Sequence, residues 1–389
     1  MTAAITSSVG ALRQWFPTLA HNVHLAACSI APRSAAMEQA LNQMLDDLGR
    51  PGFWAACEEQ LWRARRGFAN LIGAHVDQIA VLPSASVAAF QASAAMRWRR
   101  RRALVTGTAE FPGLAHVWLA RQSCGARVRW CGSRAGQVST SDYVKAITPR
   151  TALVSAPAVS YRDAIRLDVA RIAEAAHAAG AKLFVDAYQA AGVMPVNVDK
   201  MGCDYLVTGT GKYLLGLPGL AFLYVRDPSG PAPTLTGRFG RTAPNAFDAM
   251  TLDFPSNARR LETGTPSAAA TYAAVTGLDM ISQLDPVAIR QHTQRLIAAA
   301  AVRLAERGET VRLASTAEEQ GAHLALVEPH AEAMTAWLAH RGLTVAPRAS
   351  VVRLAMHAYT TIDDIDALCA AIESYRTRSR TRQRTGASR

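Results

Sequence analysis

The sequence predicts an α/β protein: a large domain with a mostly parallel seven-stranded sheet between helices, followed by a smaller α+β C-terminal domain. Between about residues 77 and 225, short apolar runs alternate with stretches whose apolar residues recur every three or four positions. Continuously apolar strands that alternate with helices are typical of parallel sheets covered on both faces. After Gly264 the order changes to helices followed by short strands, which indicates a second unit.

Seven runs are predicted as the strands of the large sheet: Ile79–Leu82, Ala103–Thr106, Arg127–Trp130, Ala152–Ser155, Lys182–Asp186, Tyr205–Val207 and Leu220–Val225. The helical pattern is clear from Val169 to Ala179. In the smaller unit we expect helices at 268–284, 286–307 and 361–375, and strands at 311–313, 323–327 and 351–354. The last helix starts with Thr361-Ile-Asp-Asp, which has the spacing of an N-terminal cap.

Four segments follow from these patterns. Residues 1–30 form an N-terminal segment that packs on the small domain, and residues 31–264 form the large domain. Residues 265–375 form the small domain, and residues 376–389 form a disordered basic tail. Six of the last fourteen residues are arginines among Ser, Thr, Gln and Gly, a composition that cannot build a core. The alternative is an arm that binds nucleic acid, and the tail composition favours disorder over it.

The composition is that of an ordinary globular protein. Of the 389 residues, 50% are hydrophobic and 19% are charged, which allows a large core. No apolar run reaches the roughly 18 residues that a membrane span needs, and no signal sequence is recognisable, so we expect a cytoplasmic protein. The six cysteines form no CxxC pair, so we expect reduced, buried cysteines and no metal site.

An acidic and a basic residue follow two of the predicted strands. Asp186 ends the run Lys182–Asp186, and Lys212 lies 26 residues later in the glycine-rich turn of Thr-Gly-Thr-Gly-Lys212. A carboxylate at the end of a buried strand needs a cationic partner. An acid and a lysine at neighbouring strand ends suit a pyridine cofactor, because the acid keeps the ring nitrogen protonated and the lysine forms an imine.

A phosphate site is expected beside these two residues. Leu82-Pro-Ser84-Ala85-Ser86 places small and hydroxyl residues between a strand and an apolar helix, where exposed amides and the helix dipole can hold an anion. The alternative for Ser84 or Ser86 is a helix cap with no ligand.

These stretches give the chain a resemblance to fold-type I pyridoxal 5'-phosphate (PLP) enzymes of the class V aminotransferase superfamily, especially kynureninase-like and isopenicillin-epimerase-like members. The resemblance covers about residues 24 to 375. Its motifs occur in the family's order: His24-Leu-Ala-Ala-Cys-Ser, Ser84-Ala-Ser, Glu110-Phe-Pro, Ser160-Tyr-Arg, Val185-Asp-Ala-Tyr-Gln, Gly-Lys212-Tyr-Leu-Leu-Gly, Arg260-Leu-Glu-Thr-Gly-Thr-Pro and Val352-Arg-Leu.

The resemblance implies a set of cofactor residues. Lys212 would form the Schiff base, and Asp186 would pair with the pyridinium nitrogen. Phe111 would stack on the ring, although a core phenylalanine is the alternative. The remaining candidates for binding the cofactor are Ser84, Ala85, Ser86, Gln189, Thr210 and Thr265. Thr265 matches a threonine that reaches the phosphate from a second subunit, so the resemblance also implies a homodimer with shared active sites.

The resemblance assigns the substrate carboxylate to Arg353, whose planar fork can bind both oxygens. Arg348 and Ser29 are further candidates, with a surface arginine as the alternative for Arg348. Arg238, Phe239 and Arg241 could line a side-chain pocket or a surface loop. Two positions depart from the family: Gly211 stands where many relatives have histidine, and Ala164 where glycine is usual.

The expected reaction starts from an amino acid whose α-proton Lys212 removes. Glu110-Phe-Pro and Ser160-Tyr-Arg resemble the kynureninase-like branch, which favours cleavage or elimination at the β-carbon. Residues 341–350 contain no cysteine, so a persulfide mechanism is not expected. The alternatives are an aminotransferase, an amino-acid epimerase and a non-catalytic binding protein with the same fold.

Overall fold

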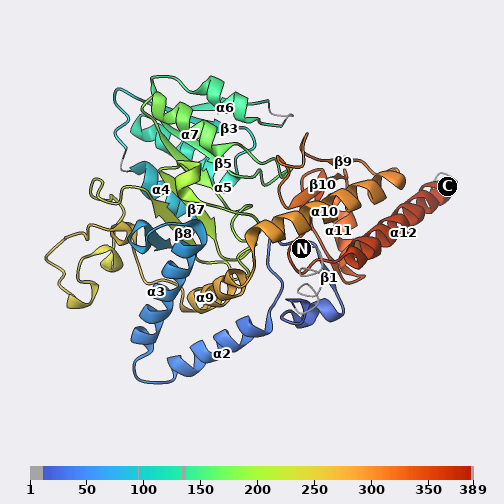
Figure 1. Ribbon diagram of the computed structural model, residues 1–389, viewed down its shortest axis with the longest axis horizontal. Helices are drawn as coiled ribbons and strands as arrows, with labels where there is room; N and C mark the ends of the chain where they lie inside the picture. Colours follow the sequence, from blue (N-terminus) through green and yellow to red (C-terminus); the bar gives the residue numbers. More distant parts are fainter. Residues whose placement is uncertain (1–11, 95, 134–136, 387–389) are drawn as a thin grey trace.

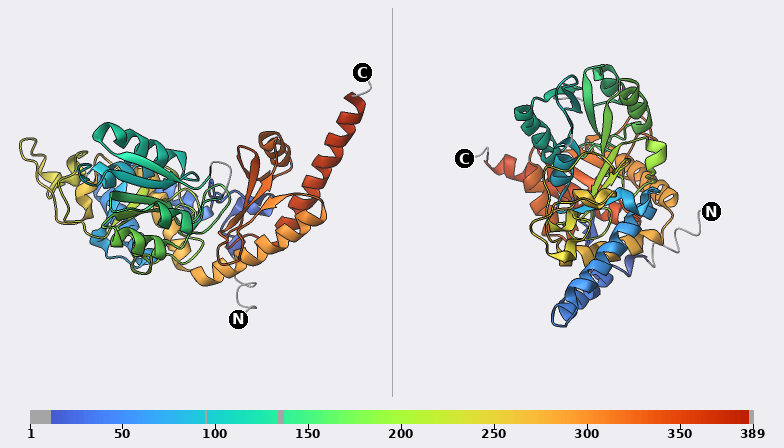
Figure 2. Two further views of the ribbon diagram at one scale, coloured as in Figure 1. Left: turned by 90° about the horizontal axis from the view of Figure 1, so that it is seen from above. Right: turned by 90° about the vertical axis from the view of Figure 1, so that its left-hand side faces the viewer.

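The computed structural model describes residues 12–94, 96–133 and 137–386, and these residues form two bodies. The larger body contains a seven-stranded sheet, and the smaller contains a four-stranded sheet. Helices α9 (Ala268–Ser282) and α10 (Pro286–Glu306) lead from the first body to the second (Figure 1). The views in Figure 2 show the small body at one end of the molecule, with α12 (Ile362–Gly386) projecting from it.

The seven strands of the large sheet lie in the order β2-β8-β7-β6-β5-β3-β4. Their bounds are β2 Ile79–Leu82, β3 Ala103–Gly107, β4 Arg127–Cys131, β5 Thr151–Pro157, β6 Lys182–Asp186, β7 Tyr205–Gly209 and β8 Ala221–Val225. The pairings from β7 through β4 are parallel, whereas β8 is antiparallel to both of its neighbours. The predicted α/β class and mostly parallel sheet are therefore confirmed, and β8 is the reversed strand.

Helices cover both faces of this sheet because alternate residues of each strand enter different cores. Leu183 and Leu206 pack in a core with α3 (Phe53–Ile72), α7 (Val169–Ala178) and α9. Phe184 and Val207, one position further along the same strands, pack with α4 (Ala85–Ala94) and α5 (Pro112–Ala120). Burial on both sides explains why these strands read as continuous apolar runs.

The small sheet is antiparallel, in the order β12-β13-β10-β9. Its strands are β9 Val311–Arg312, β10 His323–Val327, β12 Ala346–Arg348 and β13 Val351–Ala355. One face packs on α10, α11 (Ala331–Ala339) and α12. In the N-terminal segment, β1 (Val23–His24) pairs in parallel with β11 (Leu343–Thr344), so this segment contacts the small body.

The remaining elements connect these layers: α2 Ala35–Leu48, α6 Thr140–Ala146, α8 Val198–Met201, and the short 3-10 helices η1 Pro17–Ala20, η2 Val76–Gln78, η3 Arg121–Cys124, η4 Arg238–Gly240, η5 Pro244–Ala246 and η6 Ala258–Leu261. Helix α9 packs in the core of the large body, so the chain leaves that body after Ser282 and not at residue 264.

Among the described residues, none of the helices combines the length and apolarity needed to cross a membrane.

Two expectations about the surface are wrong. Cys124 is exposed, unlike the other five cysteines. Helix α12 runs to Gly386, so residues 376–386 are helical rather than disordered, while residues 387–389 lie outside the described part. The reason lies at Arg376, whose Nε and Nη2 donate to Glu309 at 2.7 and 2.8 Å and whose Nη1 lies 2.6 Å from Glu328 Oε2. The side chains of both acids are buried, so they hold the helix where sequence composition alone favoured disorder.

Replacing Arg376 with leucine should lower the free energy of unfolding by roughly 2–3 kcal/mol, because two buried carboxylates lose their cation. The estimate is below that for a fully buried pair because Arg376 is partly exposed. Chemical denaturation monitored by circular dichroism measures the change. The control is Arg378→Leu, an exposed position two residues further on, which should cost less than about 1 kcal/mol. Equal losses in the two variants would contradict the anchoring role of Arg376.

Candidate active site

A cavity of about 220 Å³ opens at the carboxyl ends of the parallel strands. It is lined by Ser84, Ala85, Ser86, Phe111, Gly113, Leu114, Tyr161, Asp186, Tyr188, Gln189 and Lys212. These residues end or follow β2, β3, β5, β6 and β7, so strands that run in one direction bring them to one edge of the sheet. The structure thus brings together seven of the cofactor residues that the sequence predicted.

Lys212 lies between two aromatic rings. Its Nζ is 4.7 Å from the centroid of the Tyr188 ring and 5.4 Å from that of Phe111. Burial lowers the pKa of Lys212 to about 8, Asp186 opposes the shift, and Arg353 and Arg348 add to it. A lysine with this pKa carries a substantial neutral fraction near pH 8, which is the nucleophilic form.

Asp186 is held in place at the end of β6. Its Oδ1 accepts a hydrogen bond of 2.8 Å from the Tyr188 backbone N–H, and only 8% of the residue is exposed. Burial raises the pKa of Asp186, while the Tyr188 N–H and Lys212 oppose the rise. Such a carboxylate gains from a nearby cation, which a protonated pyridine nitrogen would supply.

Gln189 follows on the same turn. Its Nε2 donates to the Cys28 carbonyl at 3.0 Å, and its buried Oε1 has no hydrogen-bond partner among the described residues. An amide with one N–H engaged keeps a second for a ligand in the cavity.

Phe111 stands on the cavity wall and not in the core. Its backbone N–H donates to Glu110 Oε1 at 3.0 Å, and Glu110 Oε2 accepts from Thr106 and Ser155. Burial and the nearby Asp186 raise the pKa of Glu110 to about 7. The Phe111 ring meets the Tyr161 ring edge-on, with centroids 5.3 Å apart. The hydrogen bond to Glu110 and the contact with Tyr161 hold the Phe111 ring at the wall of the cavity.

The proposed phosphate end of the cavity begins α4. Ser84 Oγ accepts a hydrogen bond from the Val87 N–H, so Ser84 caps the helix. Ser86 Oγ donates to the Gly113 carbonyl at 3.0 Å. Both residues also line the cavity, where the amides at the start of a ten-residue helix favour an anion.

These features fit PLP. The cavity offers a helix start for a phosphate, an acid for a ring nitrogen and a lysine with a lowered pKa for an aldehyde. It also offers an aromatic ring face and the unpartnered Gln189 Oε1. The residues that would hold the cofactor are therefore Ser84, Ala85, Ser86, Phe111, Asp186, Gln189 and Lys212.

Arg353 lies on β13, buried beside the cavity. Its Nη1 donates to the Tyr161 carbonyl at 2.9 Å, whereas its buried Nε and Nη2 have no partner among the described residues. Arg348 on β12 is exposed and donates to the Pro347 carbonyl. Ser29 lies beyond the residues that line the cavity, next to Cys28.

Two further candidates do not line this cavity. Thr210 donates its hydroxyl to the carbonyls of Leu217 and Leu220, so it fixes the turn that carries Lys212. Thr265 is exposed outside the cavity of its own chain.

The two departures from the family pattern have physical explanations. A Cβ at Gly211 would lie 2.7 Å from the backbone nitrogen of Pro218, so a histidine does not fit there. Ala164 has a φ of 58°, the left-handed conformation in which glycine is favoured.

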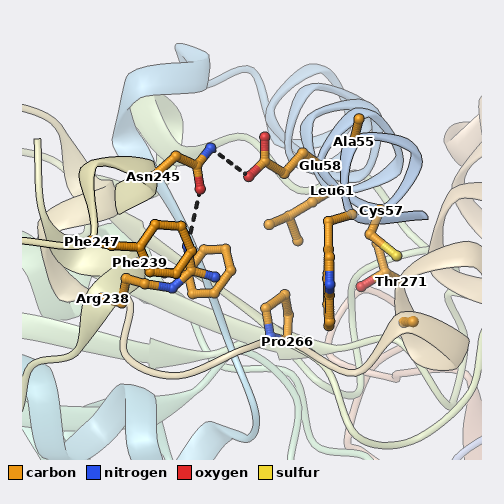
Figure 3. A pocket seen from close by; sticks show the side chains of 12 residues that line it. Ala55, Cys57, Glu58, Leu61, Arg238, Phe239, Asn245, Phe247, Pro266 and Thr271 are labelled. Atoms are coloured by element: carbon orange, nitrogen blue, oxygen red, sulfur yellow. Dashed lines mark hydrogen bonds between the residues drawn. The ribbon is translucent and has the colours of Figure 1, made fainter. Parts of the chain in front are cut away.

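A second, larger cavity of about 440 Å³ lies apart from the strand ends, between α3 and the segment 238–271 (Figure 3). Arg238 and Phe239 line it, so they do not line the pocket around Lys212. Arg238 Nη1 donates to Asn245 Oδ1, and Asn245 Nδ2 donates to Glu58. Arg241 pairs with Asp253. The smaller cavity is the candidate active site, because it holds Lys212 and the buried Asp186.

Comparisons with known proteins agree with this geometry. The family model "Aminotransferase class-V" matches residues 49–368. An uncharacterized aminotransferase, YcbU of Bacillus subtilis, is 35% identical over 91% of this chain and 94% of its own length. A kynureninase of Deinococcus radiodurans is 30% identical over 72% of this chain and 69% of its own. The apo cysteine desulfurase of Thermococcus onnurineus has the same fold, with a TM-score of 0.82 at 18% identity, covering 94% of this chain and 97% of that chain.

The fold and the site define a PLP-dependent enzyme of fold type I. The chain belongs to the class-V aminotransferase family. The expected fold, family and cofactor are thereby confirmed.

Sequence reasoning missed several residues of the site. Tyr188 lies two positions after Asp186, and Tyr161 lies within a quoted motif, yet neither was assigned a role. The alternation of side chains after a strand end is the signal that could have found Tyr188. Gly113 was missed as well, although an added Cβ there would lie 3.1 Å from the Phe111 ring and would press on it.

Covalent capture of PLP by the apo-enzyme should depend on pH with a midpoint near 8. Only the neutral amine of Lys212 attacks the aldehyde, and its pKa of about 8 lies below the ordinary 10.5. The rate should rise through pH 8 and level off above about pH 9, measured by stopped-flow absorbance. Asp186→Asn removes a carboxylate that raises this pKa, so its midpoint should be lower. A wild-type rate that still rises above pH 10 would contradict the lowered pKa.

Replacing Phe111 with leucine should weaken PLP binding by roughly 3- to 12-fold, the value of an aromatic stacking contact. Leucine keeps an apolar side chain at the start of α5, so the fold should persist. Equilibrium dialysis against PLP gives the affinity, and thermal unfolding of the apo-enzyme checks the fold. Unchanged affinity would show that the ring does not contact the cofactor.

Proposed function

We propose that the enzyme acts on an α-amino acid, removes its α-proton with Lys212, and cleaves or eliminates a group at the β-carbon. The observation that carries the proposal is the position of Tyr161. Its ring meets Phe111 at the cavity, and its carbonyl accepts a hydrogen bond from Arg353. Tyr161 therefore links the wall of the cofactor cavity to the arginine proposed for the substrate carboxylate.

Arg353, Lys212 and Asp186 would each have a separate role in this reaction. Arg353 has Nε and Nη2 free for a carboxylate, a geometry that allows two parallel hydrogen bonds. In the PLP-loaded enzyme the Lys212 amine would be the base that takes the α-proton, and its lowered pKa suits it to do so near neutral pH. Asp186 would keep the cofactor nitrogen protonated. PLP supplies the electron sink for the bond that breaks.

The β-carbon reaction has support from the kynureninase among the relatives and from the Glu110-Phe-Pro and Ser160-Tyr-Arg motifs, whose Phe111 and Tyr161 line this cavity. A second candidate is transamination, which the name of the 35% identical relative favours. It would use Lys212 for both proton transfers. Epimerisation remains the third candidate and requires a second proton donor, for which the cavity offers Tyr161 and Tyr188.

We also propose a homodimer in which the segment around Thr265 contributes to the cavity of a second copy. Thr265 is exposed, and so are apolar side chains that line the second cavity or lie in the segment 238–271 beside it. Phe247 is 77% exposed, Met250 95% and Trp54 59%. Exposed apolar side chains of this size gain free energy when a second surface covers them.

Product analysis of the PLP-loaded enzyme tests the reaction. A panel of amino acids is incubated with and without a keto acid, and products and α-deuterium exchange are followed by mass spectrometry and proton NMR. Turnover without a keto acid, with release of a fragment from the β-carbon, supports the lyase. Turnover that requires a keto acid supports the aminotransferase instead.

Lys212→Ala should lose both turnover and the visible absorption that borohydride bleaches, whereas the control Lys200→Ala, at an exposed position on α8, should keep both. If Lys212→Ala retained exchange at the α-carbon, the proposed base would be wrong.

Sedimentation of the wild type tests the dimer.

A further inference from the structure

His323 lies on the same face of the small sheet as Arg353. In the ladder between β10 and β13, His323 faces Ala355 and Ala325 faces Arg353. Residues opposite each other, and those two positions along, share a face, so His323 and Arg353 are diagonal neighbours within roughly 8 Å. The intervening Leu324 and Leu354 point into the apolar core on the other face. The face with His323 and Arg353 is the one that Tyr161 of the large body meets.

Both polar side chains on this face are buried and incompletely paired. His323 is 0% exposed and Arg353 1%. Among the described residues, Nε and Nη2 of Arg353 have no hydrogen-bond partner, and neither ring nitrogen of His323 makes a well-aligned hydrogen bond, although the Tyr161 carbonyl lies close to the ring. Buried donors without partners are costly and rare, so two such groups side by side point to a ligand that satisfies both.

The charges around His323 indicate what kind of ligand fits. Burial, and then the nearby Arg353 and Lys212, hold the pKa of His323 well below its usual range, while the Tyr161 carbonyl opposes the shift. A neutral imidazole keeps one N–H donor without adding a third positive charge. A carboxylate offers acceptor positions beyond the two that a bidentate arginine uses, so it can also accept this N–H.

The backbone around His323 is fixed before any ligand binds. Gln320 Nε2 donates to the His323 carbonyl at 2.7 Å, and Gln320 Oε1 accepts from the Ala314 N–H. The loop of Tyr161 is attached to the same region, because Gly321 N–H donates to the Ala164 carbonyl. Arg353 Nη1 is committed to Tyr161, which leaves its other two nitrogens for the ligand.

We propose that His323 is a second ligand of the substrate carboxylate, donating a ring N–H to the oxygens that Arg353 binds. This assignment rests on the proposed function, in which the substrate is an amino acid held by Arg353. It adds a binding and orienting role at a residue of the small body, on a strand next to the one that carries the arginine.

The test uses the PLP-loaded enzyme and propionate, a carboxylate without an amine, with propionamide as its uncharged counterpart. Affinities come from competitive inhibition and from the change in cofactor absorption. His323→Leu should weaken propionate binding roughly tenfold or more, because a hydrogen bond to a charged group is lost. The KM of the amino-acid substrate should rise by a similar factor with kcat little changed, while propionamide binding and the absorption spectrum stay the same.

His323→Asn keeps a donor and should recover part of the propionate affinity. His340→Leu, an exposed position in the small body, is the control and should bind propionate like the wild type. Thermal unfolding checks that each variant is folded. Wild-type propionate affinity in His323→Leu would overturn the proposal, and so would an equal loss of propionamide and propionate binding.

Failure of the underlying function has a different signature. If the wild type bound PLP but turned over no amino acid, the proposed function would fail, yet propionate could still separate His323→Leu from the wild type. If Arg353→Leu lost propionate affinity and His323→Leu did not, the arginine assignment would stand and the histidine assignment would fall.

Discussion

The shared direction of the parallel strands is the constraint on which this molecule depends. Because β3, β5, β6 and β7 run the same way, the loops that follow them converge at one edge. Glu110, Phe111, Tyr161, Asp186 and Lys212 are far apart in the chain, yet each follows one of those ends. Lys212 and Asp186 are both buried at this edge, and burial is the main cause of the shift in the pKa of each.

The sequence predicted the strands of the large sheet well because burial on both faces removes polar residues from them. Strands β2 and β6 begin and end where the pattern placed them. The site residues predicted from motifs, such as Lys212, Asp186 and Phe111, line one cavity for the same reason. Local pattern and tertiary environment coincide in these segments.

Other features depend on contacts that a linear pattern does not contain. The reversed direction of β8 is set by its antiparallel pairing with β7. The position of His323 beside Arg353 follows from the register of β10 and β13. Thr210 lies near Lys212 in sequence, but its hydroxyl is used by the turn itself. The end of α12 depends on Glu309 and Glu328, which lie in other segments and reverse what the arginine-rich composition favoured.

The turn that carries Lys212 also restricts how this protein can change. With Pro218 packed against Gly211, no side chain can be added at 211 while the proline backbone stays in place. A single substitution to histidine would therefore have to shift the turn that holds Lys212 before it could supply a new proton donor. A histidine at 211 therefore requires a second substitution at 218. A protein with the histidine alone would have a distorted turn at Lys212.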